Sequence, residues 1–295
     1  MCIRDRPPSA RPPSGASGRG ERVRPLWLGL TAAAALAAGV LIRLGLDSLG
    51  EAPPGPSYAV RGTDFAGRVA VGERVPTGSG DVTLEVGAIG ALRVAEGSDL
   101  VVQDIREDRH ELFLGRGRVE ASISAEPRVF QLGTPAALTV DMGCVYSVDV
   151  DDERRTVLHV SLGLVSVEAG ERAVFVPEGS SCVAHPDLGP EVPLWDGTPA
   201  EVQAAVRRIQ FAADPAPGEL EFLVGLRDTL VLWHLLSAPS AAVRAAAYDN
   251  LDAEHSAPST VSRATVLGPD GPERRLALED WRVNLGVSWW IGSPW

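Results

Sequence analysis

The residue types that most often do chemistry are sparse in this chain of 295 residues, and they form no catalytic pattern. Its five histidines are scattered, and no two have the His-x-x-x-His spacing of a zinc site on a helix; they are His110, His159, His185, His234 and His255. No Gly-x-Ser-x-Gly elbow, phosphate loop or dinucleotide fingerprint occurs. All 27 basic residues are arginine, which excludes chemistry that needs a lysine. We therefore expect a protein that is not an enzyme and that uses no metal or cofactor.

Two short motifs admit a chemical interpretation, but turns explain them better. Gly115 and Gly117 are too closely spaced for a phosphate loop, whereas hairpin turns favour such glycines. The acidic run over residues 149–153 lacks the spaced ligands of a calcium loop. We interpret this run as the solvated tip of a hairpin.

Cys144 and Cys182 are candidates for a disulfide bond. Both follow the apolar segment 26–46, on the side that we assign below to an oxidising compartment, where a disulfide persists. We expect them to form a disulfide between neighbouring strands. The alternative is that both are buried thiols that pack as small apolar residues.

The elements that would hold these residues are strands over residues 61–185. Short runs in which every second residue is apolar, such as 82–86, 119–123 and 158–162, are typical of half-buried strands. Turn residues such as Gly-Ser-Gly-Asp at 78–81 separate the runs. The pattern predicts an all-β domain in the form of a sandwich, a roll or a solenoid-like stack.

The pattern becomes helical after a proline-rich linker at residues 186–197. Thr198 would cap a helix that begins with Pro199, and the apolar spacing predicts a further helix over 223–236. Pro239 and Ser240 would open the second helix of a helical hairpin. We expect residues 198–295 to form a small helical region onto which the tryptophan-rich tail packs; the alternative is that the tail exposes an aromatic patch.

The start of the chain predicts a membrane anchor. Residues 1–25 form a disordered arm rich in Pro, Gly, Ser and Arg, whose first six residues resemble translated adapter DNA, so Cys2 is given no function. Residues 26–46 are apolar except for Arg43, and they are long enough to span a bilayer. The arginines precede this segment, so the positive-inside rule puts the arm in the cytoplasm and all that follows outside it. The alternatives are a cleaved signal peptide and a buried core helix.

The distribution of charge argues against binding of nucleic acid by the main domain. Residues 1–25 carry six arginines and two acidic residues, whereas the formal net charge of the chain is −12. The remainder therefore has a net charge of −16, which repels phosphate backbones. Residues 47–60, rich in Pro and Gly, would link the anchor to the β-domain.

Several motifs of the β-tract resemble those of the FecR-domain family over residues 64–185. LFLGRG at 112–117, LGTP at 132–135 and DMGCVYSV at 141–148 are similar to the family's Gly-containing turn, its Thr-Pro turn and its Gly-Thr-x-Phe strand. The residues that carry the resemblance are Gly115, Gly117, Thr134, Pro135, Gly143, Cys144, Tyr146, Gly163 and Gly179. Cys144 stands where the family usually has Thr, and Tyr146 stands where it has Phe.

The resemblance implies a sensor in the bacterial envelope. Proteins of this family are anchored in the inner membrane by one helix, sense an event with a periplasmic domain and signal to an extracytoplasmic-function sigma factor, as anti-sigma regulators. The expected partners are the membrane, a sigma factor on the cytoplasmic side and an envelope protein on the periplasmic side. Two alternatives remain: an envelope binding or scaffold protein that does not signal, and a carbohydrate-active enzyme with paired carboxylates.

Overall fold

The computed structural model describes residues 55–63 and 65–291, with side chains up to residue 285 in the last helix. All of these residues belong to one compact unit, Pro54–Trp295. The predicted arm and anchor, residues 1–46, and most of the predicted linker lie outside the described residues. Among the helices of the described part, none has both the length and the apolar character that crossing a bilayer requires.

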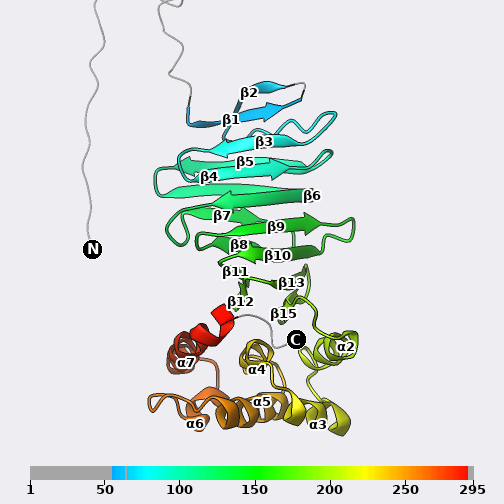
Figure 1. Ribbon diagram of the computed structural model, residues 1–295, viewed down its shortest axis with the longest axis vertical. Coiled ribbons are helices and arrows are strands. Elements are labelled where there is room, and N and C mark those ends of the chain that lie inside the picture. The colour runs from blue at the N-terminus through cyan, green and yellow to red at the C-terminus, as the bar shows by residue number, and fades with distance from the viewer. Residues whose placement is uncertain (1–54, 64, 292–295) are drawn as a thin grey trace, which may run out of the picture. The chain divides into compact units, whose positions relative to one another are not determined.

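The β-domain consists of two sheets that stack their strands along one direction (Figure 1). The first sheet has the order β2–β1–β3–β4–β6–β9–β10–β13, and the short strands β14 and β15 pair with the outer edge of β13. The second sheet has the order β5–β6–β7–β8–β11–β12, and β6 contributes to both sheets. Neighbouring strands are antiparallel except for β6 and β7. The strands are β1 (Ser57–Gly62), β2 (Ala66–Ala70), β3 (Val82–Val86), β4 (Gly90–Val94), β5 (Asp99–Arg106), β6 (Arg109–Ile123), β7 (Phe130–Gly133), β8 (Leu138–Asp141), β9 (Val145–Val150), β10 (Thr156–Leu162), β11 (Leu164–Ala169), β12 (Arg172–Pro177), β13 (Ser180–His185), β14 (Gly189–Pro190) and β15 (Leu194–Trp195).

Alternating side chains fill the space between the sheets. In β3, for example, Val82, Leu84 and Val86 are buried, whereas the residues between them point to solvent. The same period of two continues through β9 and β10 into a single apolar core. The predicted β-domain is therefore confirmed, although its first strand begins at Ser57, inside the segment predicted as a linker.

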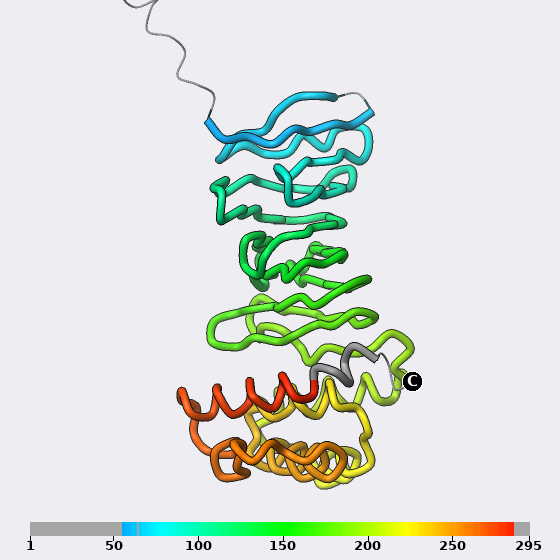
Figure 2. Tube along the Cα trace, turned by 60° about the vertical axis from the view of Figure 1, so that its left-hand side comes forward, coloured from blue at the N-terminus to red at the C-terminus, as the bar shows by residue number. Residues whose placement is uncertain are grey.

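The helices follow the β-domain at the end where β12, β13 and β15 lie (Figure 2). They enclose a second apolar core around Leu230, Val243 and Trp281. Trp281 packs edge-on against Tyr248, with ring centroids 5.1 Å apart, as predicted for this residue. The side chains of the other three tryptophans of the tail lie outside the described part of the chain, so their packing stays a prediction. The helices are α2 (Ala200–Ile209), α3 (Pro217–Gly225), α4 (Thr229–Leu235), α5 (Ala241–Glu254), α6 (Arg263–Leu267) and α7 (Pro272–Ile291).

Two details of the helical region differ from prediction. The helix predicted over 223–236 is broken, because Asp228 caps a new helix by accepting a hydrogen bond from the Val231 amide at 3.1 Å. Thr198 is not a cap: its hydroxyl donates to the Trp195 carbonyl at 2.8 Å, and α2 begins two residues later. The predicted cap Ser240 is confirmed, since its hydroxyl accepts from the Val243 amide.

The predicted linker 186–197 is part of the folded core. Its residues form β14 and β15 on the edge of β13, and Val192 and Trp195 are buried among the helices. The Trp195 indole donates a hydrogen bond of 3.2 Å to Asp228 at the start of α4. The β-domain and the helices are therefore joined by buried contacts.

Candidate functional site

The motif glycines lie at turns and bulges that shape the two sheets. Gly117, Gly143, Gly163 and Gly179 all have positive φ angles, a region that residues with a Cβ seldom adopt. Gly117 lies where β6 passes from one sheet to the other, and a Cβ there would be 2.6 Å from Ser98 Cα. Gly115 precedes it on the same continuous strand, so the hairpin turn predicted at Gly115 and Gly117 is wrong. These residues are structural.

Thr134 and Pro135 form a buried turn between β7 and β8. The Thr134 hydroxyl accepts hydrogen bonds from the Ala137 amide at 3.0 Å and from the Thr156 hydroxyl at 2.8 Å. The Thr134 amide donates to the Ala137 carbonyl at 2.8 Å. This turn therefore links the second sheet to β10 of the first sheet.

The predicted disulfide is wrong, since Cys144 and Cys182 are both free and buried thiols. Cys182 of β13 pairs in register with Leu158 of β10, which pairs in turn with Val148 of β9. Cys144 directly precedes β9, so the two cysteines are two strand positions apart. That offset is about 10 Å across the sheet, with a further ~13 Å along it from Val148 to Cys144. A disulfide needs the two Cα atoms within about 7 Å. The sequence does not reveal this register.

The DMGCVYSV motif, which runs from the end of β8 into β9, carries a buried polar group that was not predicted from the sequence. Asp141 is fully buried, and burial raises its pKa to about 6 although Oδ1 accepts the Gly143 amide at 2.6 Å. Burial also raises the pKa of the Cys144 thiol to about 11. The Tyr146 hydroxyl and Asp141 Oδ2 are buried and have no hydrogen-bond partner among the described residues. Protonation of such groups can make the stability of the fold depend on pH. Their burial keeps them out of contact with a substrate.

Four of the five histidines each make a different side-chain contact. His110 Nδ1 lies 2.7 Å from the Tyr58 hydroxyl, and burial lowers its pKa. His234 joins α4 to β12, because its Nε2 accepts from the Phe175 amide at 3.0 Å. His159 and His185 pair with carboxylates of the former linker, as described below.

The acidic run forms the predicted hairpin tip between β9 and β10. Asp151 accepts a hydrogen bond of 2.9 Å from the Arg155 side chain, and Asp149 pairs with Arg118 at 3.0 Å. Within residues 55–63 and 65–291, no group of three or more His, Cys, Asp or Glu side chains has the geometry to hold a metal ion.

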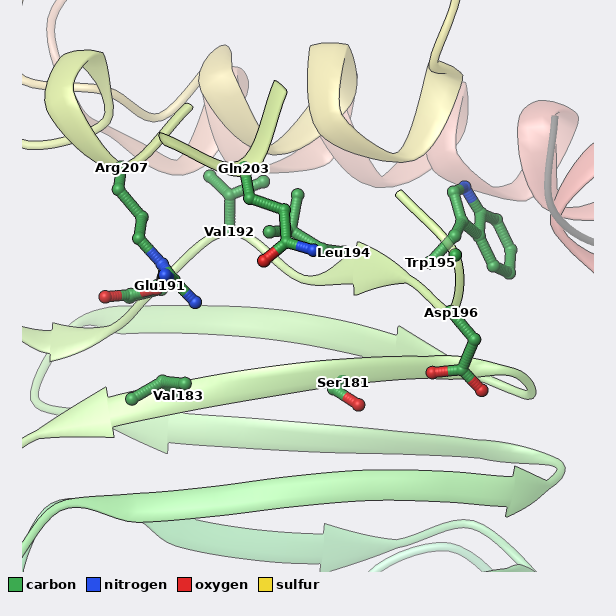
Figure 3. Close-up of a pocket in the computed structure, with 10 residues that line it drawn as sticks. Ser181, Val183, Glu191, Val192, Leu194, Trp195, Asp196, Gln203 and Arg207 are labelled. Carbon is green, nitrogen blue, oxygen red and sulfur yellow. Dashed lines mark hydrogen bonds and ion pairs between the residues drawn. The ribbon is translucent and has the colours of Figure 1, made fainter. Parts of the chain in front are cut away.

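A cavity of about 230 Å³ lies between β13 and α2 and is a candidate binding site (Figure 3). Ser181 and Val183 of β13 form one wall, and Gln203 and Arg207 of α2 form the opposite wall. The segment that was predicted as a linker closes the back of the cavity with Val192 and Leu194. Sequence reasoning missed this site because its walls come from three elements.

Two carboxylates lie at opposite ends of the cavity. Glu191 is held beside β13 by its amide, which donates to the Val183 carbonyl at 2.7 Å. Its side chain is bound by His185 at 2.8 Å and by Arg207 at 3.3 Å. At the other end, Asp196 is bound by His159 at 3.0 Å. The site therefore offers polar groups for binding, with one carboxylate at each end.

Comparisons with known proteins give weak similarities. No family model matches the chain, and no curated protein matches it. Two crystal structures of a candidate anti-sigma factor from Parabacteroides distasonis, at 1.65 Å and 2.50 Å resolution, each share 18% identity over 52% of this chain. They match over 71% and 70% of their own chains, with TM-scores of 0.33 and 0.28. Similarity at this level gives no information about function.

Proposed function

We propose that the chain is a membrane-anchored FecR-like regulator that passes a periplasmic signal to an extracytoplasmic-function sigma factor. In this proposal residues 26–46 are the anchor in the bacterial inner membrane, the arm is cytoplasmic and the described unit is periplasmic. The protein is not an enzyme. It acts through contacts with a sigma factor on one side of the membrane and with an envelope protein on the other.

The observation that carries the proposal is the structural role of the FecR-like residues. Gly117 allows β6 to serve both sheets, Gly163 allows the chain to pass from β10 to β11, and Thr134 anchors the turn before β8. Gly117, Gly163 and Thr134 are therefore each suited to the backbone or the hydrogen bonds of their position in this fold. This supports a β-domain of that type.

The outer face of the first sheet supports a protein contact. Val145 of β9 and Leu162 of β10 are direct neighbours in the sheet, and they are 37% and 55% exposed. Towards the other end of the sheet, ion pairs such as Arg61–Glu85 cover the same face. In this proposal, the neighbouring exposed side chains of Val145 and Leu162 are part of the contact with the envelope protein.

The topology is tested by reporter fusions. A reporter that is active only in the periplasm should work when fused after Trp295 and should be silent when fused before residue 26. Release of a soluble mature chain from membranes would instead indicate a cleaved signal peptide.

The regulatory role is tested by measuring transcription across the genome. Deletion of the gene should change a set of transcripts that share one promoter class, and the full chain should restore them. If no promoter class responds, the second candidate function applies, an envelope binding or scaffold protein that does not signal. The exposed apolar pair on β9 and β10 favours that candidate equally well.

A further inference from the structure

We infer that the cavity between β13 and α2 binds a guanidinium or ammonium group on a slim aliphatic carrier. This inference rests on the lining of the cavity alone, so it holds whether or not the protein regulates a sigma factor. The two carboxylates at its ends, the acceptors between them and its volume each bear on the ligand.

The charges of the lining favour a cation. Glu191 and Asp196 contribute two negative charges, and Arg207 contributes one positive charge. Glu191 is 11% exposed and already has Arg207 as its cationic partner. Asp196 is 57% exposed and has His159 as its partner, with no arginine bound to it in the described part of the chain. The end of the cavity at Asp196 therefore has a carboxylate that a cation can pair with.

The neutral polar groups add acceptors at the same place. The Gln203 Nε2 atom donates to the Thr198 carbonyl at 2.8 Å, which leaves the side-chain oxygen to accept a bond from a ligand. Figure 3 shows Gln203 reaching from α2 towards the strand that carries Ser181, whose hydroxyl also accepts. A guanidinium or ammonium group has only donors, so it complements such a lining.

The volume and the walls limit the size of the ligand. At 230 Å³ the cavity is smaller than the ~300–1,000 Å³ of sites for drug-sized molecules. Val183, Val192 and Leu194 line it, and they suit the methylene groups of an aliphatic stem. The cavity therefore accepts a group of the size of one arginine or lysine side chain. Two sources carry this chemistry: a free alkyl amine or guanidine, and a basic side chain on a polypeptide.

Calorimetric titration of the full chain with matched probes tests the inference. Butylguanidinium should bind, whereas butylurea, which has nearly the same shape and no charge, should not. A capped Gly-Arg-Gly peptide and its citrulline counterpart test the second source in the same way. Binding of butylguanidinium alone identifies a free ligand, and binding of the arginine peptide identifies a polypeptide side chain.

Three variants connect binding to the cavity. Asp196→Asn should weaken butylguanidinium binding by roughly fivefold or more, because a charge-assisted hydrogen bond becomes a neutral one. Ser181→Leu keeps the charge and should abolish binding by filling the space. Asp187→Asn removes an exposed acid from the turn between β13 and β14, outside the lining, and should leave binding unchanged. Circular dichroism checks that each variant is folded.

The inference is overturned by either of two results. One is equal binding of butylguanidinium and butylurea, which would show that the charge is not recognised. The other is unchanged butylguanidinium binding in both Asp196→Asn and Ser181→Leu, which would place the bound cation elsewhere on this acidic chain. Failure of all four probes to bind also overturns it.

Discussion

Asp141 shows how a single buried carboxyl can make stability depend on pH. Its pKa is raised from 3.8 to about 6 by burial in the β-domain, so folding favours the protonated form. This contribution to the free energy of unfolding is complete below pH 3.8 and is lost as the pH rises through about 6. At neutral pH the charged carboxylate therefore lowers the stability of the fold.

We predict that Asp141→Asn stabilises the protein at neutral pH by up to about 3 kcal/mol, the equivalent of the pKa shift. The asparagine oxygen keeps the acceptor for the Gly143 amide. Urea unfolding should show the difference between variant and parent shrinking as the pH falls from 7 towards 4. Asp187→Asn, at an exposed turn, is the control. A gain that does not change with pH would contradict the prediction.

His234 has the opposite dependence. Burial lowers its pKa from 6.5 to about 3, and its neutral ring bonds the Leu230 carbonyl at 2.7 Å and the Phe175 amide at 3.0 Å. Its contribution to stability is present above pH 6.5 and is lost as the pH falls through about 3. By pH 5 this contribution has fallen by about 2 kcal/mol, because the unfolded chain takes up the proton first.

We predict that His234→Phe costs about 1–3 kcal/mol at neutral pH, because the half-buried Phe175 amide loses its acceptor. The variant should also lose the decline in stability between pH 6.5 and pH 3 that the parent shows. Unfolding titrations across this range provide the measurement. His255→Ala, at the exposed end of α5, should keep the decline. If the stability of His234→Phe still falls between pH 6.5 and pH 3 as that of the parent does, the prediction is wrong.

Residue types predicted an exposed turn better than they predicted buried pairings. The acidic run over residues 149–153 lies at the predicted hairpin tip between β9 and β10. The hairpin turn predicted at Gly115 and Gly117 is wrong, because both glycines lie inside the continuous strand β6. The burial of Asp141 and the distance between Cys144 and Cys182 depend on which strands pair, and the sequence gives no register.

At the scale of elements, the tight passage from β10 to β11 depends on Gly163. Its φ angle is +92°, and a Cβ there would be 2.9 Å from the Gly143 carbonyl oxygen and 3.1 Å from the Cys144 sulfur. Gly170, in the next turn, has a φ angle of +59° and open space around a Cβ. The two glycines thus share the left-handed backbone but differ in crowding.

We predict that Gly163→Ala costs about 3 kcal/mol, of which about 1–2 kcal/mol is the left-handed backbone and the rest is the clash. Gly170→Ala should cost only the backbone part. The free energies of unfolding of the two variants give the comparison. Equal losses would mean that the carbonyl and the thiol move aside freely.

The helices were predictable in kind but not in extent. An apolar spacing of 3.6 residues is present over 223–236, yet it does not reveal that the chain leaves the helix near Leu226. Asn250 of α5 makes this break possible, because its side-chain amide donates to the Leu223 carbonyl at 2.8 Å and to the Leu226 carbonyl at 2.5 Å. The partner that stabilises the break is thus more than twenty residues away in sequence.

At the scale of the whole described unit, β12 is where the two apolar cores meet. The ring centroid of Phe175 in β12 lies 6.0 Å from that of Trp233 in α4. The Arg282 guanidinium of α7 lies 4.4 Å from the Phe175 centroid. The Trp195–Asp228 hydrogen bond joins β15, which pairs with the edge of β13, to the start of α4. If the β-domain and the helices were independent, side chains such as Phe175 and Trp195 would be exposed to solvent.

We therefore predict that the strands and helices of the described unit unfold in one cooperative transition, with coincident urea curves from circular dichroism and tryptophan fluorescence. Phe175→Ala should shift both curves together by roughly 2 kcal/mol, because half-buried aromatic contacts with α4 and α7 are lost. Phe65→Ala removes an exposed ring at the turn between β1 and β2 and should shift neither curve appreciably. Separate transitions in the parent would mean that the helices are stable without the sheet, and the contacts of Phe175 would then be too weak to couple them.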